Sequence, residues 1–259
     1  PNQRNLWPNF QSPLVFDMVA ISTYLTVSSL FWYTGMLPDL ARVRDGATGF
    51  RRKVFTVLSL GWTGHHDQWR HYTRGYLFFA ALATPLVLSV HSVVSWDFAM
   101  ADTPGWHSTL FPPYFVGGAI FSGCAMVITL MVPLAKFFKL EDYMNVWHFE
   151  HLAKLCMFTG GILTYAYGTE YFIAWYSDNK YEWGTFVDRV TGNYWWVFWT
   201  MVFCNCISPL PWYFKKVRTS YFWLFTISIL INIGMWFERY NIIASSLAHS
   251  FDPGAWVYY

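Results

Sequence analysis

The chain has 259 residues, of which 55% are hydrophobic, 22% aromatic and only 12% charged. Ordinary soluble domains carry about 25% charged residues, so this composition excludes a soluble globular protein and indicates a membrane protein. The formal net charge is +2, and the basic residues are scattered through short loops. Because no continuous basic face forms, the sequence also excludes a nucleic-acid partner.

Six apolar stretches are long enough to cross a lipid bilayer, which takes about 20 residues per helix. The predicted spans cover residues 13–37, 73–97, 113–136, 151–176, 193–214 and 220–246. Strand-like alternation is absent, and these runs are too long for barrel strands. We therefore expect an all-α polytopic membrane protein of six transmembrane helices, with residues 1–259 forming a single integral-membrane domain.

Basic residues concentrate in the loops on one side of the predicted bundle. These residues are Arg42, Arg44, Arg51, Arg52, Lys53, Arg70, Arg74, Lys136, Lys139, Lys215, Lys216 and Arg218. The opposite side carries Arg4, Lys180, Arg189 and Arg239. Because short cytoplasmic loops are enriched in Lys and Arg, the first side is predicted to be cytoplasmic and both termini, Pro1 and Tyr259, to lie outside.

Ionisable residues lie at the outer ends of several predicted spans. They are Asp17, His91, Asp97, Glu170, Glu238 and Arg239. Charged groups inside a membrane span are costly, so a functional site is the default interpretation. Helical spacing supports a buried polar face, because Asp17, Tyr24 and Ser28 share one side of the first span and His91 shares a side with Ser95.

Several of these residues also have a purely structural interpretation. Asp17 fits the first turn of a helix, where a carboxylate complements the helix dipole. Glu238 and Arg239 fit an exposed pair at the membrane interface. Asp102 is expected in a turn, and His107 is equally consistent with a loop residue and a site residue.

Neither histidine-rich segment matches a standard metal-binding spacing. The segment His65–His71 (HHDQWRH) lies in the basic loop and is expected at the membrane interface, and the WHFEH segment of residues 147–151 is expected to be a solvated helix entry. The four cysteines fall in apolar segments without a C-x2-C spacing, so they are expected to be small buried side chains. We therefore expect no metal ion in this chain.

Three functions fit an outer cluster of acids, a histidine and an arginine. Quinol oxidation needs acids or histidines that accept the hydroxyl protons, and aromatic side chains that hold the ring. A haem b protein needs two facing imidazoles, yet only His91 lies clearly within a span. An ion-coupled transporter remains an alternative, although no convincing internal repeat is present. A purely structural membrane anchor of a redox complex also remains open.

Several stretches closely resemble the NrfD, or polysulfide-reductase, family of membrane subunits. The stretches are NLWPNFQSPLVFDMVAISTYLTVSSLFWYTGMLPDLA, SVHSVVSWDFAMADTPGWHSTLFPPYFVGGAIFSG, LEDYMNVWHFEHLAKL, YGTEYFIAWYSDN and NIGMWFERYNII. Within that family the chain is most similar to the ActC-type subunit of bacterial alternative complex III, in preference to its paralogue ActF. The resemblance implies two four-helix bundles, so further helices are expected before Pro1.

The resemblance implies a quinol-oxidising subunit in the bacterial inner membrane, with its site near the periplasmic face. Electrons would pass to a periplasmic iron–sulfur subunit and then to haem c subunits, beside a second NrfD-like subunit and a terminal oxidase. The substrate would be menaquinol or ubiquinol, with no metal or haem in this chain. By position, the resemblance makes Asp17, Asp97 and Arg239 the catalytic candidates, with His91, Glu170 and Glu238 lining the site.

The resemblance also implies that the protein translocates protons. Candidates for an outer half path are Tyr24, Ser28, Ser92, Ser95, Tyr165, Tyr167 and Glu170. Asp39, Glu150 and His151 would form a cytoplasmic mouth. Phe16 stands where tryptophan is usual in this subfamily, which keeps an aromatic ring but removes an indole N–H donor.

Overall fold

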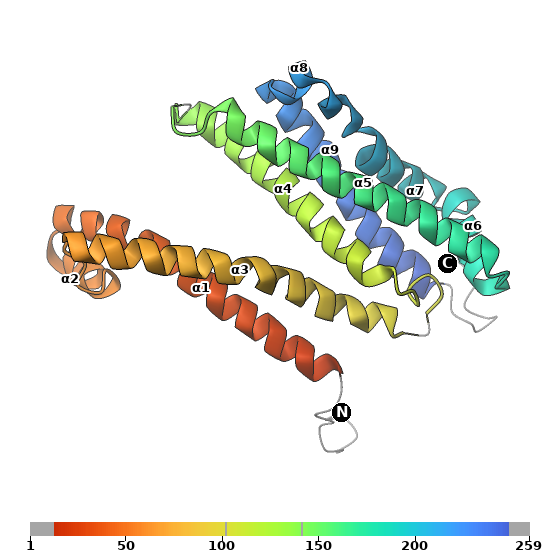
Figure 1. Ribbon diagram of the computed structural model, residues 1–259, viewed down its shortest axis with the longest axis horizontal. Coiled ribbons are helices and arrows are strands. Elements are labelled where there is room, and N and C mark those ends of the chain that lie inside the picture. Colours follow the sequence, from red (N-terminus) through yellow and green to blue (C-terminus); the bar gives the residue numbers. More distant parts are fainter. Residues whose placement is uncertain (1–12, 102, 141, 249–259) are drawn as a thin grey trace. The chain divides into compact units, whose positions relative to one another are not determined.

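The computed structural model describes residues 13–101, 103–140 and 142–248, and every regular element in these ranges is a helix (Figure 1). The chain divides into two compact units, Pro1–Val94 and Ser95–Tyr259. The division falls inside one long helix, α3 (His66–Ala99). All-helical architecture was predicted from the length of the apolar runs, and the described residues confirm it; a single membrane domain stays a prediction.

The first unit contains α1 (Pro13–Gly46), the short α2 (Gly49–Leu58) and most of α3. Aromatic contacts join α1 to α3, with the ring centroids of Phe31 and Tyr76 4.7 Å apart. A Cβ atom at Gly35 would stand 3.2 Å from the Tyr76 ring, so the glycine permits this close approach. Much of the remaining apolar surface of α1 and α3 is exposed, as suits helices that face lipid.

The second unit is a bundle built around α4 (Phe111–Phe137), α5 (Val146–Tyr176) and α9 (Tyr221–Tyr240). The helix α4 packs against both α5 and α9, and α7 (Trp195–Val202) packs against α9. Its core includes the fully buried side chains of Phe111, Phe121, Ile128, Leu163, Trp212, Leu224 and Ile231. Apolar residues at helical spacing on three neighbouring helices therefore share one core.

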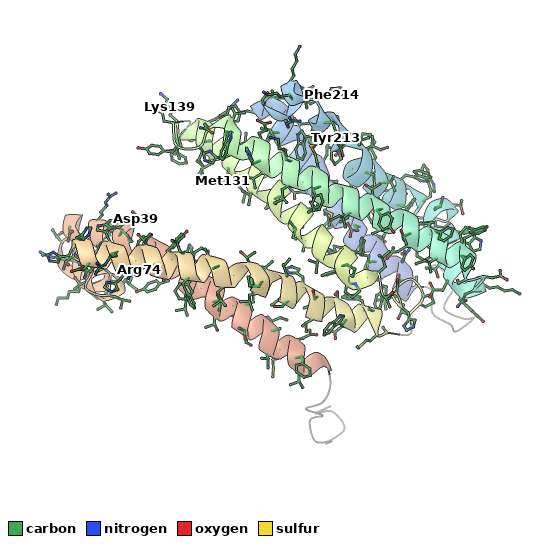
Figure 2. All side chains as sticks on the ribbon, in the orientation of Figure 1. Asp39, Arg74, Met131, Lys139, Tyr213 and Phe214 are labelled. Atoms are coloured by element: carbon green, nitrogen blue, oxygen red, sulfur yellow. The ribbon has the colours of Figure 1, made fainter. Side chains whose placement is uncertain are left out.

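The connections of the second unit lie at two opposite ends of the bundle. Lys139, Tyr213 and Phe214 lie at one end (Figure 2), close to the four-residue helix α8 (Lys215–Arg218). The loop that precedes α4 and the helix α6 (Lys180–Thr191) lie at the other end (Figure 1). Within this unit the basic segments after α4 and before α9 therefore share one end, as the distribution of charges predicts.

Four described helices are long and apolar enough to cross a membrane. They are Val15–Gly46, His66–Ala99, Phe111–Phe137 and Tyr221–Ser245. The predicted span 151–176 coincides with α5, and the predicted span 193–214 coincides with a helix that changes type along its length. Four of the predicted spans thus coincide with candidate membrane-spanning helices, whereas the number six stays a prediction.

Two π-helical turns interrupt the regular helices of the second unit. One is η2 (Phe203–Ile207), which continues α7, and the other is η4 (Asn241–Ser245), which continues α9. A 3-10 turn, η3 (Leu210–Tyr213), follows η2. A π-helical turn inserts an extra residue and rotates the side chains that follow, and such turns are frequent at functional sites.

Candidate functional site

A buried carboxylate, that of Glu238 near the end of α9, is the centre of a hydrogen-bonded group inside the bundle. The residue is 1% exposed. Tyr114 donates a hydrogen bond to Oε1 at 2.6 Å, and Tyr167 donates one to Oε2 at 2.8 Å. Asn205 Nδ2 donates to the same Oε2 at 3.3 Å. Three donors thus converge on a carboxylate held in a nearly dry core, where an unpaired polar group would be costly.

Each donor comes from a different element of the bundle. Tyr114 lies in the first turn of α4, Tyr167 lies in the second half of α5, and Asn205 lies in the π-helical turn η2. Asn205 Nδ2 also donates to the hydroxyl oxygen of Tyr167 at 3.1 Å, which ties two of the donors together. The site therefore depends on the packing of four segments that are distant in the sequence.

Gly234 allows η2 to reach the carboxylate. A Cβ atom at this position of α9 would overlap Asn205 Oδ1 and Cys204 Cβ. Only a residue without a side chain lets the π-helical turn approach α9 this closely. The interpretation of Glu238 as an exposed interfacial residue is wrong, because the bundle closes around it.

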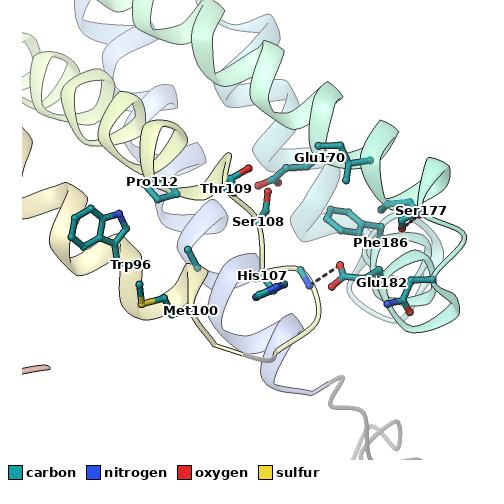
Figure 3. Close-up of a pocket in the computed structure, with 15 residues that line it drawn as sticks. Trp96, Met100, His107, Ser108, Thr109, Pro112, Glu170, Ser177, Glu182 and Phe186 are labelled. Carbon is teal, nitrogen blue, oxygen red and sulfur yellow. Dashed lines mark hydrogen bonds between the residues drawn. The ribbon is translucent and has the colours of Figure 1, made fainter. Parts of the chain in front are cut away.

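An open cavity of about 760 Å³ lies at the end of the second unit that carries the α3–α4 loop and α6 (Figure 3). It is lined by Trp96, Ala99, Met100, Gly105, His107, Ser108, Thr109, Pro112, Glu170, Ile173, Ala174, Ser177, Asn179, Glu182 and Phe186. In Figure 3 the Glu170 carboxylate points toward Ser108 and Thr109, and His107 lies beside Glu182. Acidic, imidazole and aromatic side chains thus surround one space of the size that holds a small ligand.

Glu170 connects this cavity to the buried carboxylate. It lines the open cavity and also a smaller one of about 30 Å³, whose walls include Tyr114, Tyr167 and Glu238. Arg189 lines the smaller cavity as well. Glu170 has no hydrogen bond or ion pair among the described residues, so its carboxyl group is available to a ligand or to water.

The loop at the mouth of the cavity is fixed to the bundle by hydrogen bonds. The Gly105 backbone N–H donates to Glu182 Oε2 at 3.1 Å, and the Trp106 indole donates to the Ile242 carbonyl at 2.6 Å. Partial burial raises the pKa of Glu182 above its usual value, and the Gly105 N–H and Arg189 oppose this shift. Arg189 donates to Ser245 and Ser246, which anchors α6 to the end of η4.

A third cavity has Asn205 in its wall. It measures about 430 Å³, and its walls include Thr164, Asn205, Cys206 and Tyr213. Asn205 thus both lines this cavity and donates to Glu238, which itself lines the smaller cavity of about 30 Å³.

Arg239 contacts a group of aromatic rings that includes Phe98, the neighbour of Asp97 in the sequence. The Arg239 guanidinium lies 4.1 Å from the centroid of the Phe115 ring. Phe115 stacks with Phe98, the neighbour of Asp97, at 6.0 Å between centroids. Arg239 Nη1 is buried and has no hydrogen-bond partner in the described part of the chain. The contact with the Phe115 ring stabilises the guanidinium.

Asp17 belongs to the first unit, where it is 8% exposed and its Oδ1 has no hydrogen-bond partner among residues 13–101 and the other described ranges. Tyr24 and Ser28 lie on the less exposed side of α1, as their spacing predicts. His91 Nδ1 bonds the Val87 carbonyl at 2.8 Å. Asp39 lies at the end of α1 close to α2 (Figure 2).

The other predicted residues occupy varied positions. Glu150 pairs with Arg218 at 2.9 Å and with Lys154 at 3.1 Å, whereas the His151 ring bonds the Trp147 carbonyl. Ser95 is fully buried, and Tyr165 is 70% exposed on a different face of α5 from Tyr167. The described ranges contain no group of three or more side chains placed to hold a metal ion. Asp102 lies outside the described residues.

Sequence reasoning did not identify Tyr114, Asn205, Glu182 or Arg189 as parts of a site. Asn205 could have been recognised from the sequence, because a single amide side chain inside the apolar 193–214 stretch needs a hydrogen-bond partner. Tyr114 looked like one more aromatic residue at a span end. Glu182 and Arg189 lay between two predicted spans, where charged residues are ordinary.

Comparison with known proteins agrees with this architecture. The sequence model of the family described as "Polysulphide reductase, NrfD" matches residues 5–249. A putative membrane subunit of dimethyl sulfoxide reductase from Halobacterium salinarum is 31% identical to this chain over 134 residues. That similarity covers 50% of this chain and 28% of the Halobacterium protein, so the chain spans well under two thirds of that relative.

Proposed function

The chain belongs to the NrfD family of membrane subunits of redox complexes, and we propose that it binds and oxidises quinol. The family usually partners with iron–sulfur subunits. In this proposal the quinol headgroup enters the open cavity at the α6 end of the second unit, and electrons leave to an iron–sulfur subunit bound at that end.

The observation that carries the proposal is the position of Glu170. Its carboxyl group faces a cavity of about 760 Å³ that also offers Trp96 and Phe186 as ring contacts. It has no partner among the described residues, and it lines the smaller cavity that leads to Glu238. A quinol hydroxyl bound in the open cavity would meet an acid that can accept its proton and a route along which the proton can move.

The residues of the cavity and a partner protein can together accept the protons and electrons that quinol oxidation releases. Oxidation of a quinol to a quinone releases two electrons and two protons. Glu170 accepts one hydroxyl proton, and the neighbouring His107 and Glu182 supply a second acceptor at the mouth of the cavity. Iron–sulfur clusters in a partner protein take the electrons, one at a time.

Asp97 and Arg239 extend the proposed site beyond the cavity. The unpaired Nη1 of Arg239 could donate to a ring oxygen, and Trp96, beside Asp97, already lines the cavity. Asp17, with its unpaired Oδ1, stays a separate prediction within the first unit. Asp97→Asn and Arg239→Leu are expected to lower quinol oxidation sharply in an assembled complex.

We propose a second role, proton translocation, on a separate observation. Glu238 lines a cavity that it shares with Glu170, and its donor Asn205 lines a second cavity, which also contains Tyr213. A buried acid with water-accessible space on two sides can be loaded from one side and emptied to the other. In proteoliposomes, proton uptake from the cytoplasmic side during quinol turnover would support this role, and its absence would contradict it.

The proposal extends to the class of complex that contains this subunit. We propose an ActC-type subunit of alternative complex III, in the bacterial inner membrane, with haem c subunits and a second NrfD-like subunit as partners. Mass spectrometry of the complex purified through a tag on this chain would test this assembly. Co-purification of a dimethyl sulfoxide reductase without haem c subunits would instead indicate the class to which the Halobacterium relative is assigned.

The decisive test of quinol oxidation is Glu170→Gln in the assembled complex. We expect turnover with a soluble quinol analogue to fall at least about tenfold, with a smaller change in KM, because the amide cannot accept the proton. Asp178→Asn, an exposed carboxylate at the same end of the bundle, is the matched control. Equal activity of both variants and the parent complex would exclude Glu170 as the proton acceptor.

A further inference from the structure

We propose that α2 lies in the headgroup region of the membrane and that Arg51 and Lys53 bind the phosphate groups of anionic phospholipids. This binding surface is independent of the quinol site, because it belongs to the first unit. It concerns a helix of ten residues, Gly49–Leu58, that has no buried residue.

The apolar side chains of α2 are exposed to a degree unusual for a surface helix. Phe50 is 82% exposed and Val57 is 73% exposed, while Val54 and Leu58 are each more than a third exposed. In water, a row of exposed large apolar side chains on one short helix would be a liability. At a lipid surface, the same row would be buried in the acyl boundary.

The sequence of α2 places these side chains on one side and basic residues around them. With 3.6 residues per turn, Phe50, Val54, Val57 and Leu58 fall within one arc of the helix. Arg51 and Lys53 flank this arc on its two edges, and Arg52 lies opposite. Long basic side chains at the edges of an apolar face can extend to the headgroups while their stems cover apolar surface.

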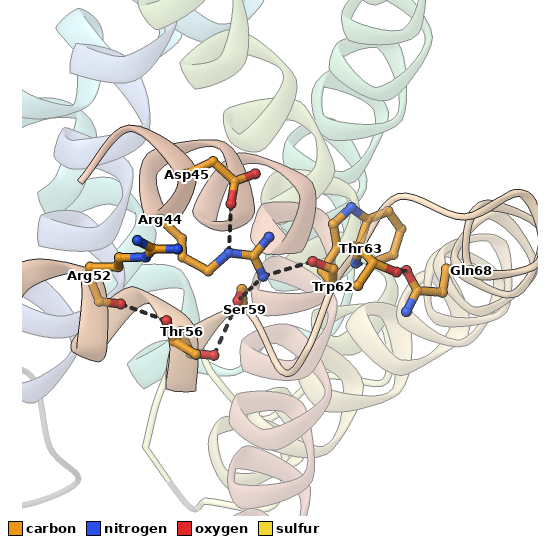
Figure 4. A network of polar contacts seen from close by, with 8 residues as sticks. All are labelled: Arg44, Asp45, Arg52, Thr56, Ser59, Trp62, Thr63 and Gln68. Atoms are coloured by element: carbon orange, nitrogen blue, oxygen red, sulfur yellow. Dashed lines mark hydrogen bonds and ion pairs between the residues drawn. The ribbon is translucent and has the colours of Figure 1, made fainter. Parts of the chain in front are cut away.

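Hydrogen bonds at its C-terminal end, rather than burial of its apolar face, fix α2 to the rest of the unit (Figure 4). Tyr33 donates to the Leu58 carbonyl, and Arg44 Nη1 donates to Ser59 Oγ at 3.2 Å and to the Trp62 carbonyl at 2.8 Å. Because these contacts use backbone and polar groups, the apolar arc of α2 remains available to another surface.

The positive charge of α2 and its position just after a candidate membrane span favour an anionic lipid surface as the partner of its apolar arc. Arg51, Arg52 and Lys53 form no ion pair within the described ranges, whereas nearby Asp45 is paired with Arg44. The helix begins at Gly49, shortly after the candidate membrane span α1 ends at Gly46. A segment at the end of a span lies at the depth of the headgroups, which combine negative charge with an apolar layer beneath.

The first experiment compares the binding of anionic lipid to variants of the purified complex. Arg51→Gln/Lys53→Gln removes the two flanking charges, and Arg52→Gln, which removes the charge opposite the apolar arc, is the matched control. Each basic residue at a membrane surface contributes about fivefold in affinity. We therefore expect the first variant to weaken binding of phosphatidylglycerol about 25-fold in nanodisc titrations with phosphatidylcholine as background, and the control to bind like the parent complex.

The second experiment measures the depth of α2 directly. Spin labels at Phe50→Cys and Arg52→Cys, with labelled parent protein as background, should show Phe50 accessible to oxygen and Arg52 accessible to a polar nickel reagent. Equal polar accessibility at both positions, unchanged lipid binding in Arg51→Gln/Lys53→Gln, or loss of a partner protein in place of lipid would each overturn the proposal. Quinol turnover, measured in parallel, separates these outcomes from a failure of the proposed function.

Discussion

Asn205 donates a hydrogen bond to the buried carboxylate of Glu238 at 3.3 Å, from a π-helical turn on a neighbouring segment. The same amide nitrogen donates to the Tyr167 hydroxyl, which itself donates to Glu238. These three groups form one hydrogen-bonded unit in the core of the bundle. Because its members support one another, removal of one should weaken the others.

Asn205→Leu should destabilise the protein and alter the pH dependence of turnover. The substitution keeps the branching at Cγ but removes a donor from a buried carboxylate, at a cost of about 1–3 kcal/mol. Asn232→Leu is the control, because Asn232 donates to Thr129 and not to Glu238. Thermal unfolding should shift in both variants, whereas the pH profile of quinol turnover should shift only in Asn205→Leu.

Gly234→Ala should be far more disruptive than a glycine substitution elsewhere in the bundle. Its Cβ would overlap Asn205 and Cys204, so η2 would have to move away from Glu238 at a cost of about 1–3 kcal/mol or more. Gly168→Ala in α5 meets no atom within 4 Å and should be neutral or stabilising by up to about 1 kcal/mol. Similar unfolding temperatures for the two variants would argue against a close η2–α9 contact.

Tyr167→Phe should cost more than Tyr114→Phe. Tyr167 donates to Glu238 and also accepts from Asn205, whereas Tyr114 makes the single bond to Glu238. With about 1 kcal/mol for each bond lost, the expected destabilisation is about 2 kcal/mol and about 1 kcal/mol respectively. Denaturation of the purified protein in detergent measures the order, and a reversed order would show that Tyr114 is the principal support.

Glu150 should contribute stability that depends on pH. Hydrogen bonds from Arg218 and then Lys154 hold its pKa at about 2, below its ordinary value of 4.5. Because the folded-state pKa is lowered, this contribution is complete above pH 4.5 and is lost as the pH falls through about 2. The unfolding temperatures of the parent and Glu150→Gln should therefore differ at pH 6 and converge in strong acid.

A constant difference between these two proteins across that range would mean that the ion pairs do not respond to protonation of Glu150. Lys154→Gln provides a graded control, because Arg218 is the stronger of the two influences on the pKa of Glu150. It should reduce the pH dependence only in part.

Composition and hydrophobic length alone determined that this is an all-helical membrane protein, because lipid forces every backbone group of a span to be satisfied within a helix. The same features predicted that Glu170 and Glu238, as acids in apolar segments, have polar partners or a function. The basic loops predicted which connections of the second unit share an end, and Lys139 and Tyr213 lie at that same end (Figure 2).

Only the tertiary structure decided which residues form the site around these acids. Tyr114, Tyr167 and Asn205 meet at Glu238 from three segments, and helical spacing within one segment carries no information about a neighbour. The π-helical turn at Asn205 changes the register that regular periodicity assumes, and Gly234 matters only because η2 packs against it. A single sequence specifies each helix and its polar faces, whereas the close approach of the helices selects which polar groups become partners.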